Sequence, residues 1–197
     1  MQTGFIVLLC WNKSSNKLLP DEKIIEQTKR WILDVVVGCN FCPFAAKVVK
    51  QQAIHYFVEN GSTKQAGLQT FIRECTRLDE SPQIETTIIL FPHAFEKFED
   101  YLDLVDLAES LLKKEGYEGI YQVASFHPNY LFAGTDADDA ANFTNRSVYP
   151  MLHLLREDSI EKALEKYPDA AGIPERNINF AREKGLVYME MLRDGCL

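Results

Sequence analysis

The sequence has no long hydrophobic run, no excess of positive charge and no familiar nucleotide-binding loop. Its apolar run at residues 5–11 is far too short to span a bilayer. The run lacks a basic leader and a small-residue cleavage site, so no signal peptide is expected. Asp and Glu number 29 against 21 Lys and Arg, and this balance gives nothing to drive counterion release from a nucleic acid. We therefore expect neither a membrane nor a nucleic acid as a partner.

Several common catalytic and binding motifs are also missing. The chain contains no G-x-G-x-x-G, no P-loop, no G-x-S-x-G elbow and no H-E-x-x-H. The acidic cluster at 136–139 resembles the start of an EF-hand loop, but Ala141 and Ser147 stand where that loop needs glycine and glutamate. The sequence therefore indicates no common nucleotide-binding, serine-hydrolase, zinc-protease or calcium-loop class.

The cysteines do not form a disulfide pattern. There are five, at positions 10, 39, 42, 75 and 196, and an odd, scattered count is not typical of a small secreted domain. We expect a cytoplasmic protein with reduced thiols. Cys39 and Cys42 spell C-x-x-C, but the motif follows a predicted helix rather than a strand, and no second C-x-x-C could complete a four-cysteine zinc site.

Predicted strands alternate with predicted helices along most of the chain. The hydrophobic pattern predicts strands at 54–58, 85–91 and 120–126, and helices at 21–37, 43–49, 67–78, 95–114, 150–166 and 175–184. This order predicts one α/β domain over residues 21–197, with a small, three- to four-stranded, mostly parallel sheet flanked by helices. Residues 1–20 differ in character and are expected to be a variable N-terminal extension.

The stretch from residue 125 to residue 157 is the expected location of function. In α/β sheets, ligands bind beyond the carboxyl ends of the strands, and His127 directly follows the third predicted strand. Residues 129–148 show no hydrophobic period and are rich in turn-forming residues. A connection of that length inside a compact domain is typical of an ordered functional loop.

Cys42 is the first candidate for chemistry. If Pro43 occupies the first helical position, Cys42 is the N-cap, where free N–H groups and the helix dipole favour a thiolate. The opposing interpretation is an inert, buried cysteine, which its apolar neighbours favour equally.

A polar stripe is expected on the helix that Pro150 opens. Tyr149, His153, Arg156 and Glu157 fall at i, i+4, i+7 and i+8 on an otherwise apolar segment. Such a stripe is either a solvated face or one wall of a site. His153 alone is more often a structural histidine than a catalytic one.

At these residues the chain resembles a mostly bacterial family, domain of unknown function 1415 (DUF1415). The resemblance spans about residues 22–190 and rests on GCNFCPFA at 38–45, ETT at 85–87, QVASFHPNY at 122–130, FAGT at 132–135, TNRSVYPMLHLLRE at 144–157 and ERN at 175–177. The family shows leucine where this chain has Cys39, which weakens the C-x-x-C interpretation and leaves Cys42. The resemblance implies no activity, but it implies that these motif residues belong to one family pattern.

The first functional hypothesis is an enzyme of hydrolase or transferase type acting on a small anionic molecule. Its catalytic residues would be Cys42, His127, His153 and Glu157, with the cysteine as nucleophile. Guanidinium groups match carboxylate or phosphate, so the substrate-binding set would be Asn145, Arg146, Ser147, Tyr149 and Arg156.

Two alternatives remain open at this point. Cys42, His127 and His153 could instead hold a transition metal such as zinc or iron. Otherwise the polar residues are structural, and the protein is a non-catalytic binding or assembly module in which Arg146 and its neighbours stabilise the long loop. Nothing in the sequence assigns an oligomeric state.

Overall fold

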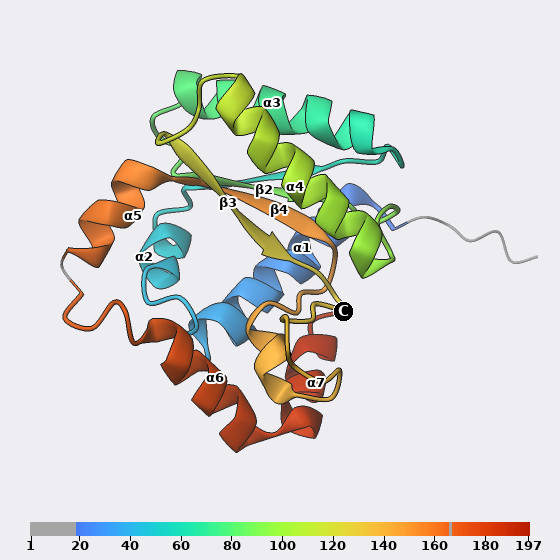
Figure 1. The fold of residues 1–197 in the computed structure, drawn as a ribbon, viewed down its shortest axis with the longest axis vertical. Coiled ribbons are helices and arrows are strands. Elements are labelled where there is room, and N and C mark those ends of the chain that lie inside the picture. The colour runs from blue at the N-terminus through green and yellow to red at the C-terminus, as the bar shows by residue number, and fades with distance from the viewer. Residues whose placement is uncertain (1–18, 166) are drawn as a thin grey trace, which may run out of the picture.

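The computed structural model describes residues 19–165 and 167–197, in which one sheet carries helices on both faces (Figure 1). In chain order the elements are α1 (Asp21–Trp31), η1 (Ile32–Val37, a π-helix), α2 (Ala45–Lys50), β1 (Ile54–Val58), α3 (Lys64–Glu80), β2 (Thr86–Leu90), α4 (Phe98–Lys114), β3 (Tyr121–Phe126), η2 (Ala140–Thr144, a 3₁₀-helix), β4 (Met151–Arg156), α5 (Glu157–Leu164), α6 (Ile173–Lys184) and α7 (Leu186–Asp194). Of the extension expected over residues 1–20, residues 1–18 lie outside the described part. None of the helices described is long and apolar enough to cross a membrane.

Within the part of the chain that the structure describes, the sheet has four strands in the order β1-β2-β4-β3. Strands β1 and β2 are parallel, whereas β4 pairs antiparallel with both β2 and β3. The α/β class and the strand number are confirmed, but the expectation of a mostly parallel sheet is wrong. Strands β1, β2 and β3 do run in one direction, and β4 returns between β2 and β3, so that two of the three pairings are antiparallel.

Strand β4 occupies the segment in which a helix had been predicted. Four of its six residues are apolar, and Leu152 and Leu154 are fully buried on one face of the sheet. A short, continuous apolar run does not distinguish a buried strand from a buried helix by its period. Pro150 precedes the first strand residue, where its missing N–H costs no ladder bond. The helix expected at 150–166 therefore begins only at Glu157, as α5.

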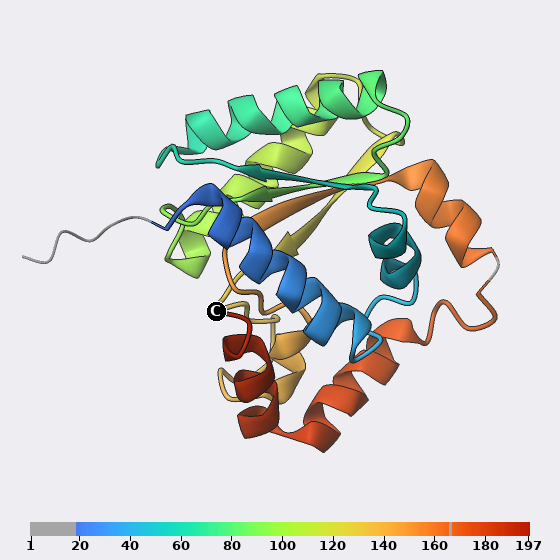
Figure 2. The same ribbon diagram turned by 180° about the vertical axis from the view of Figure 1, so that it is seen from behind.

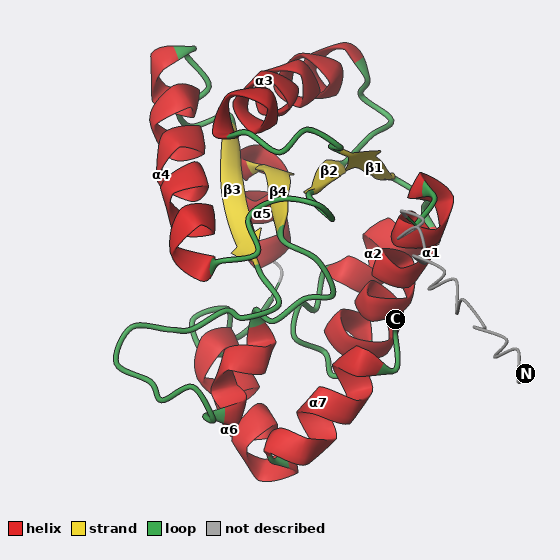
Figure 3. Ribbon diagram, turned by 90° about the vertical axis from the view of Figure 1, so that its right-hand side faces the viewer, coloured by secondary structure: helices red, strands yellow, loops and turns green. Residues whose placement is uncertain are grey.

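Each face of the sheet has its own hydrophobic core. Helices α3 and α4 cover one face, where Ile89, Leu152 and Leu154 meet Phe71 and Leu104. Helix α1 crosses the other face (Figure 2), in a core that joins β2 and β4 to α1, η1 and the last two helices. Figure 3 shows α6 and α7 at the end of the molecule remote from α3, with the long connection from β3 to β4 beside them.

Helix α1 continues into the π-helix η1, after which the chain turns sharply toward α2. Trp31 and Val35 are buried, as the periodicity predicts. Gly38 ends this segment because a side chain does not fit there: a Cβ would lie 2.2 Å from the carbonyl oxygen of Asp34. The turn at residues 39–44 then places its side chains beside α6.

Candidate functional site

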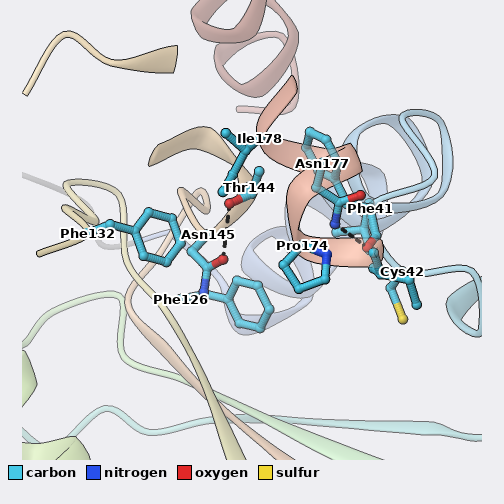
Figure 4. Close-up of a pocket in the computed structure, with 11 residues that line it drawn as sticks. Phe41, Cys42, Phe126, Phe132, Thr144, Asn145, Pro174, Asn177 and Ile178 are labelled. Carbon is cyan, nitrogen blue, oxygen red and sulfur yellow. Dashed lines mark hydrogen bonds between the residues drawn. The ribbon is translucent and has the colours of Figure 1, made fainter. Parts of the chain in front are cut away.

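A cavity of about 310 Å³ lies between the end of β3, the long loop and α6 (Figure 4). It is lined by Val36, Phe41, Cys42, Phe126, Phe132, Thr144, Asn145, Ile173, Pro174, Asn177 and Ile178. None of these eleven side chains is charged. The volume is at the lower end of the roughly 300–1,000 Å³ that small-molecule sites occupy.

The two amide side chains of the cavity fix its walls. Asn145 donates from Nδ2 to the Ser125 carbonyl at 3.1 Å, which ties the loop to β3. Asn177 on α6 donates from Nδ2 to the Phe41 carbonyl at 2.7 Å, which ties α6 to the turn before α2. Each amide can form about four hydrogen bonds, so part of its capacity is left for a ligand.

Cys42 lies in this cavity, on the side opposite Asn145 in Figure 4, but it is not a helix cap. Helix α2 begins at Ala45, and its N-cap is Phe44. The N-cap role predicted for Cys42 is wrong because a turn at residues 43–44, closed by the Ala45 N–H and the Cys42 carbonyl at 3.2 Å, separates Cys42 from the helix. The thiol is half-buried, whereas the other described cysteines, Cys39, Cys75 and Cys196, are buried.

His127 follows β3 as predicted, but its ring is directed to the α4 side of the sheet. It is fully buried, with ring centroids 5.2 Å from Phe98 and 5.0 Å from Tyr101. Nε2 lies 2.8 Å from the Phe95 carbonyl oxygen and therefore donates, while Nδ1 accepts the N–H of Asn129 at 3.0 Å. Burial lowers the pKa of His127 below its ordinary value. This is a neutral histidine with both nitrogens engaged, and it does not line the cavity.

His153 lies on the opposite face of the sheet from His127. It pairs in register with Ala124 of β3 and Ile88 of β2, and its ring lies 6.3 Å from that of Phe126. The predicted helical stripe is wrong, because alternation along β4 places His153 on one face and Arg156 on the other. Nε2 of His153 is enclosed and has no hydrogen-bond partner among residues 19–165 and 167–197.

Arg146 stabilises the long loop from inside. Its Nε donates to the Tyr130 carbonyl at 3.0 Å and its Nη2 to the Ala137 carbonyl at 2.8 Å. The guanidinium also lies 4.8 Å from the Phe143 ring. Burial lowers the pKa of Arg146. The guanidinium N–H groups that were expected to bind a substrate anion therefore donate to two carbonyls of the loop.

Arg156 makes a similar set of contacts at another place. Its donors reach the Leu78 carbonyl at 2.6 Å and the Ile84 carbonyl at 3.1 Å, across the connection from α3 to β2. Glu157, expected to be a catalytic residue, begins α5 and forms no ion pair with any residue in the described ranges.

The remaining candidates contact the protein itself. Ser147 donates to the Tyr149 carbonyl at 2.6 Å, and the Tyr149 hydroxyl bonds to Gln27 on α1. Of the nine residues proposed from the sequence, only Cys42 and Asn145 line the cavity. Phe126 and Asn177 also line the cavity but were not proposed as site residues from the sequence. Asn177 belongs to the ERN motif at residues 175–177, which could have identified it as a candidate.

The alternative of a metal site finds no support in the geometry. No group of three or more His, Cys, Asp or Glu side chains within the described parts of the chain is placed to hold a metal ion. His127 has no free ring nitrogen to offer, because both are bonded to the backbone.

A family model described as protein of unknown function (DUF1415) matches residues 23–191. The chain belongs to this family. No curated protein and no solved structure matches it. The matched range includes all four strands and every residue that lines the cavity, so the cavity belongs to the part of this DUF1415 protein that the family pattern covers.

Proposed function

We propose that this DUF1415 protein binds a small, uncharged and largely apolar molecule in the cavity beside Cys42. The uncharged lining carries the proposal, because an ionised group placed there would lose its hydration without gaining a counter-charge. The lining favours a neutral ligand over the small anion expected from the sequence. Asn145 and Arg146 then act mainly by holding the loop after β3, which forms one wall, in place.

Thiol chemistry at the same site is the second candidate function. Cys42 is the described cysteine that lines the cavity and is not fully buried, so an electrophilic carbon on a bound molecule would meet its sulfur. Cys42→Ser separates the two functions. Simple binding tolerates this near-isosteric change, whereas a thiol-dependent reaction is lost with it.

Alkylation of Cys42 in the presence of candidate ligands tests the proposal. The experiment uses a Cys10→Ser background, so that Cys10, which lies outside the described residues, does not contribute. A library of neutral small molecules is screened by melting temperature, and each compound that raises it is tested for slowing the reaction of Cys42 with iodoacetamide. We expect true ligands to do both, because a ligand that binds only the folded state stabilises it.

Two matched variants localise the binding. Val36→Phe fills the cavity from η1, whereas Val187→Phe adds the same bulk on the exposed face of α7, where Val187 is 69% exposed. We expect at least a tenfold loss of affinity in Val36→Phe and no change in Val187→Phe. Equal affinity for both variants would exclude the cavity as the binding site.

A further inference from the structure

His153 is an ionisable side chain on a mostly apolar face of the sheet. Its strand neighbours on that face are Ile88 and Met151, which belong to the core under α1. Its Nε2 is enclosed and lacks a partner in the described parts of the chain. Burial lowers the pKa of His153 to about 4, and no charged neighbour offsets this effect. The His153 side chain as a whole is half-buried, but its Nε2 is enclosed. Buried polar atoms normally have a hydrogen-bond partner, so the unpaired nitrogen calls for an explanation.

Phe126 connects His153 with the cavity. Its ring lines the cavity and also lies 6.3 Å from the His153 ring, with 41° between the planes. A third ring, that of Trp31, meets Phe126 edge-on at 5.4 Å. The residue opposite His153 on β3 is Ala124, a small side chain that leaves the space beside the imidazole to Phe126.

We propose that Phe126 is a partition that determines specificity, and that His153 is the concealed hydrogen-bonding group behind it. When the Phe126 ring turns aside, a ligand in the cavity reaches Nε2 of His153. This inference rests on the cavity being a ligand site. Rotation of one aromatic side chain needs no change in the backbone of β3, since rotamers interconvert within a fixed fold.

The arrangement also defines the class of ligand. The displaced ring leaves an apolar space beside Trp31, and this space suits another planar ring. The nitrogen at its end accepts or donates one hydrogen bond, according to the tautomer of the neutral imidazole. The expected ligand is therefore an uncharged aromatic compound with one hydroxyl or amine, and phenol is the simplest probe.

A pH titration of the histidine ring signals by NMR, without any ligand, tests the partition. His153 is assigned from the signal that disappears in His153→Gln. In Phe126→Ala we expect its pKa to rise from about 4 toward the ordinary value near 6.5, because water then reaches Nε2 through the cavity. Phe132→Ala is the matched control. Phe132 lines the same cavity, but its ring packs against that of Tyr130, with the centroids 4.9 Å apart.

An unchanged pKa in Phe126→Ala, or an equal rise in Phe132→Ala, would overturn the partition. If Phe126→Ala does not fold, Phe126→Leu replaces it, with a smaller rise expected and no rise counting against the proposal. The titration uses no ligand, so its failure leaves the proposed binding function intact. Conversely, loss of cavity binding in the alkylation test leaves the titration result standing.

Phenol and toluene test the ligand class, because they share a shape and differ in the hydroxyl. We expect phenol to shift the His153 ring signals of the unmodified protein and to bind at least tenfold more tightly than toluene. His153→Leu should abolish this preference. Equal binding of the two compounds, or a preference that survives in His153→Leu, would show that His153 does not serve the site.

Discussion

Arg146 acts at the scale of one residue, through two carbonyls that a shorter side chain cannot reach. The Tyr130 and Ala137 carbonyls both accept from its guanidinium, and each lies in the loop between β3 and β4. Removing the donors leaves these acceptors short of partners, which costs more than the hydrogen bonds contribute when they are formed.

We expect Arg146→Ala to lower the free energy of unfolding by about 1–3 kcal/mol. Arg146→Lys should recover little of this, because an ammonium group keeps the charge but not the planar fork. Urea unfolding measures the change, with Arg182→Ala as control, since Arg182 forms an exposed ion pair with Asp139 on the same loop. An unchanged urea midpoint in Arg146→Ala would contradict the structural role assigned to Arg146. A larger loss of stability in Arg182→Ala than in Arg146→Ala would contradict it too.

His153 gives the stability of the protein a pH dependence. Its pKa is about 4 when folded and about 6.5 when unfolded, so between these values the unfolded chain binds more protons. The free energy of unfolding is therefore largest above pH 6.5 and falls by up to about 3 kcal/mol as the pH drops to 4. His55 and His127, whose pKa values are also lowered by burial, add to the same slope.

Replacement of His153 by an apolar residue tests this attribution. His153→Leu should reduce the slope between pH 6.5 and pH 4 and leave the contributions of His55 and His127. Chemical unfolding at several pH values measures it, with His93→Gln as control because His93 is exposed. A slope that is the same in wild type and His153→Leu would show that His153 is not the titrating group.

At the scale of the element, the end of η1 determines where the cavity wall lies. Gly38 permits the close passage of the Asp34 carbonyl, and the turn that follows carries Phe41 and Cys42 into the cavity. A methyl group at 2.2 Å from a backbone oxygen forces the backbone itself to move, because no side chain is available to yield.

We therefore expect Gly38→Ala to displace the turn and to increase the rate at which Cys42 reacts with iodoacetamide. The measurement is the alkylation rate in the Cys10→Ser background, followed by intact mass. Gly134→Ala is the control: Gly134 has a φ of +80° and open space around it, so the change strains the loop without moving the Cys42 turn. An alkylation rate in Gly38→Ala equal to that of the control would refute this account.

The elements that the sequence predicted correctly are those with a clear hydrophobic period. Helix α1 begins at Asp21 as expected, and strand β2, with its run of β-branched residues, lies at Thr86–Leu90. Strand β4 failed because a short apolar run has no distinguishing period, and the polar stripe drawn from it failed with it. Helix α7 was not predicted from the sequence. Only Met189 is buried in it, so the segment lacks a periodic apolar stripe that would indicate a helix.

Two of the nine residues proposed from the sequence line the cavity, and the other seven do not. The loop after β3 does form one wall, and Cys42 and Asn145 do line the cavity. Sequence alone could not show that His127 faces α4, since that depends on a hydrogen bond to Phe95, a residue 32 positions earlier. Nor could the sequence show that Arg146 and Arg156 donate their hydrogen bonds to backbone carbonyls of the chain itself.

At the scale of the whole molecule, the cavity depends on three segments that are remote in sequence. The turn before α2, the loop after β3 and helix α6 each supply part of the lining. Helix α7 closes the arrangement from behind, where Arg193 donates to the Pro128 carbonyl at 3.0 Å and lies 5.3 Å from the Phe143 ring. Its partners lie in the loop after β3, at Pro128, and in η2, at Phe143.

Removing this contact should loosen the loop while the sheet stays intact. In Arg193→Ala we expect faster amide hydrogen exchange over residues 128–147 and unchanged exchange in β2, because local opening of a loop costs less than unfolding of the core. Arg30→Ala on α1 is the control, since the Arg30 side chain is 59% exposed.

Arg193→Ala should also weaken ligand binding in the cavity, because a loop that samples other conformations must be ordered again by the ligand. Faster exchange in β2 as well would mean that α7 supports the whole fold, and no change in the loop would mean that Arg146 and Asn145 hold it without α7.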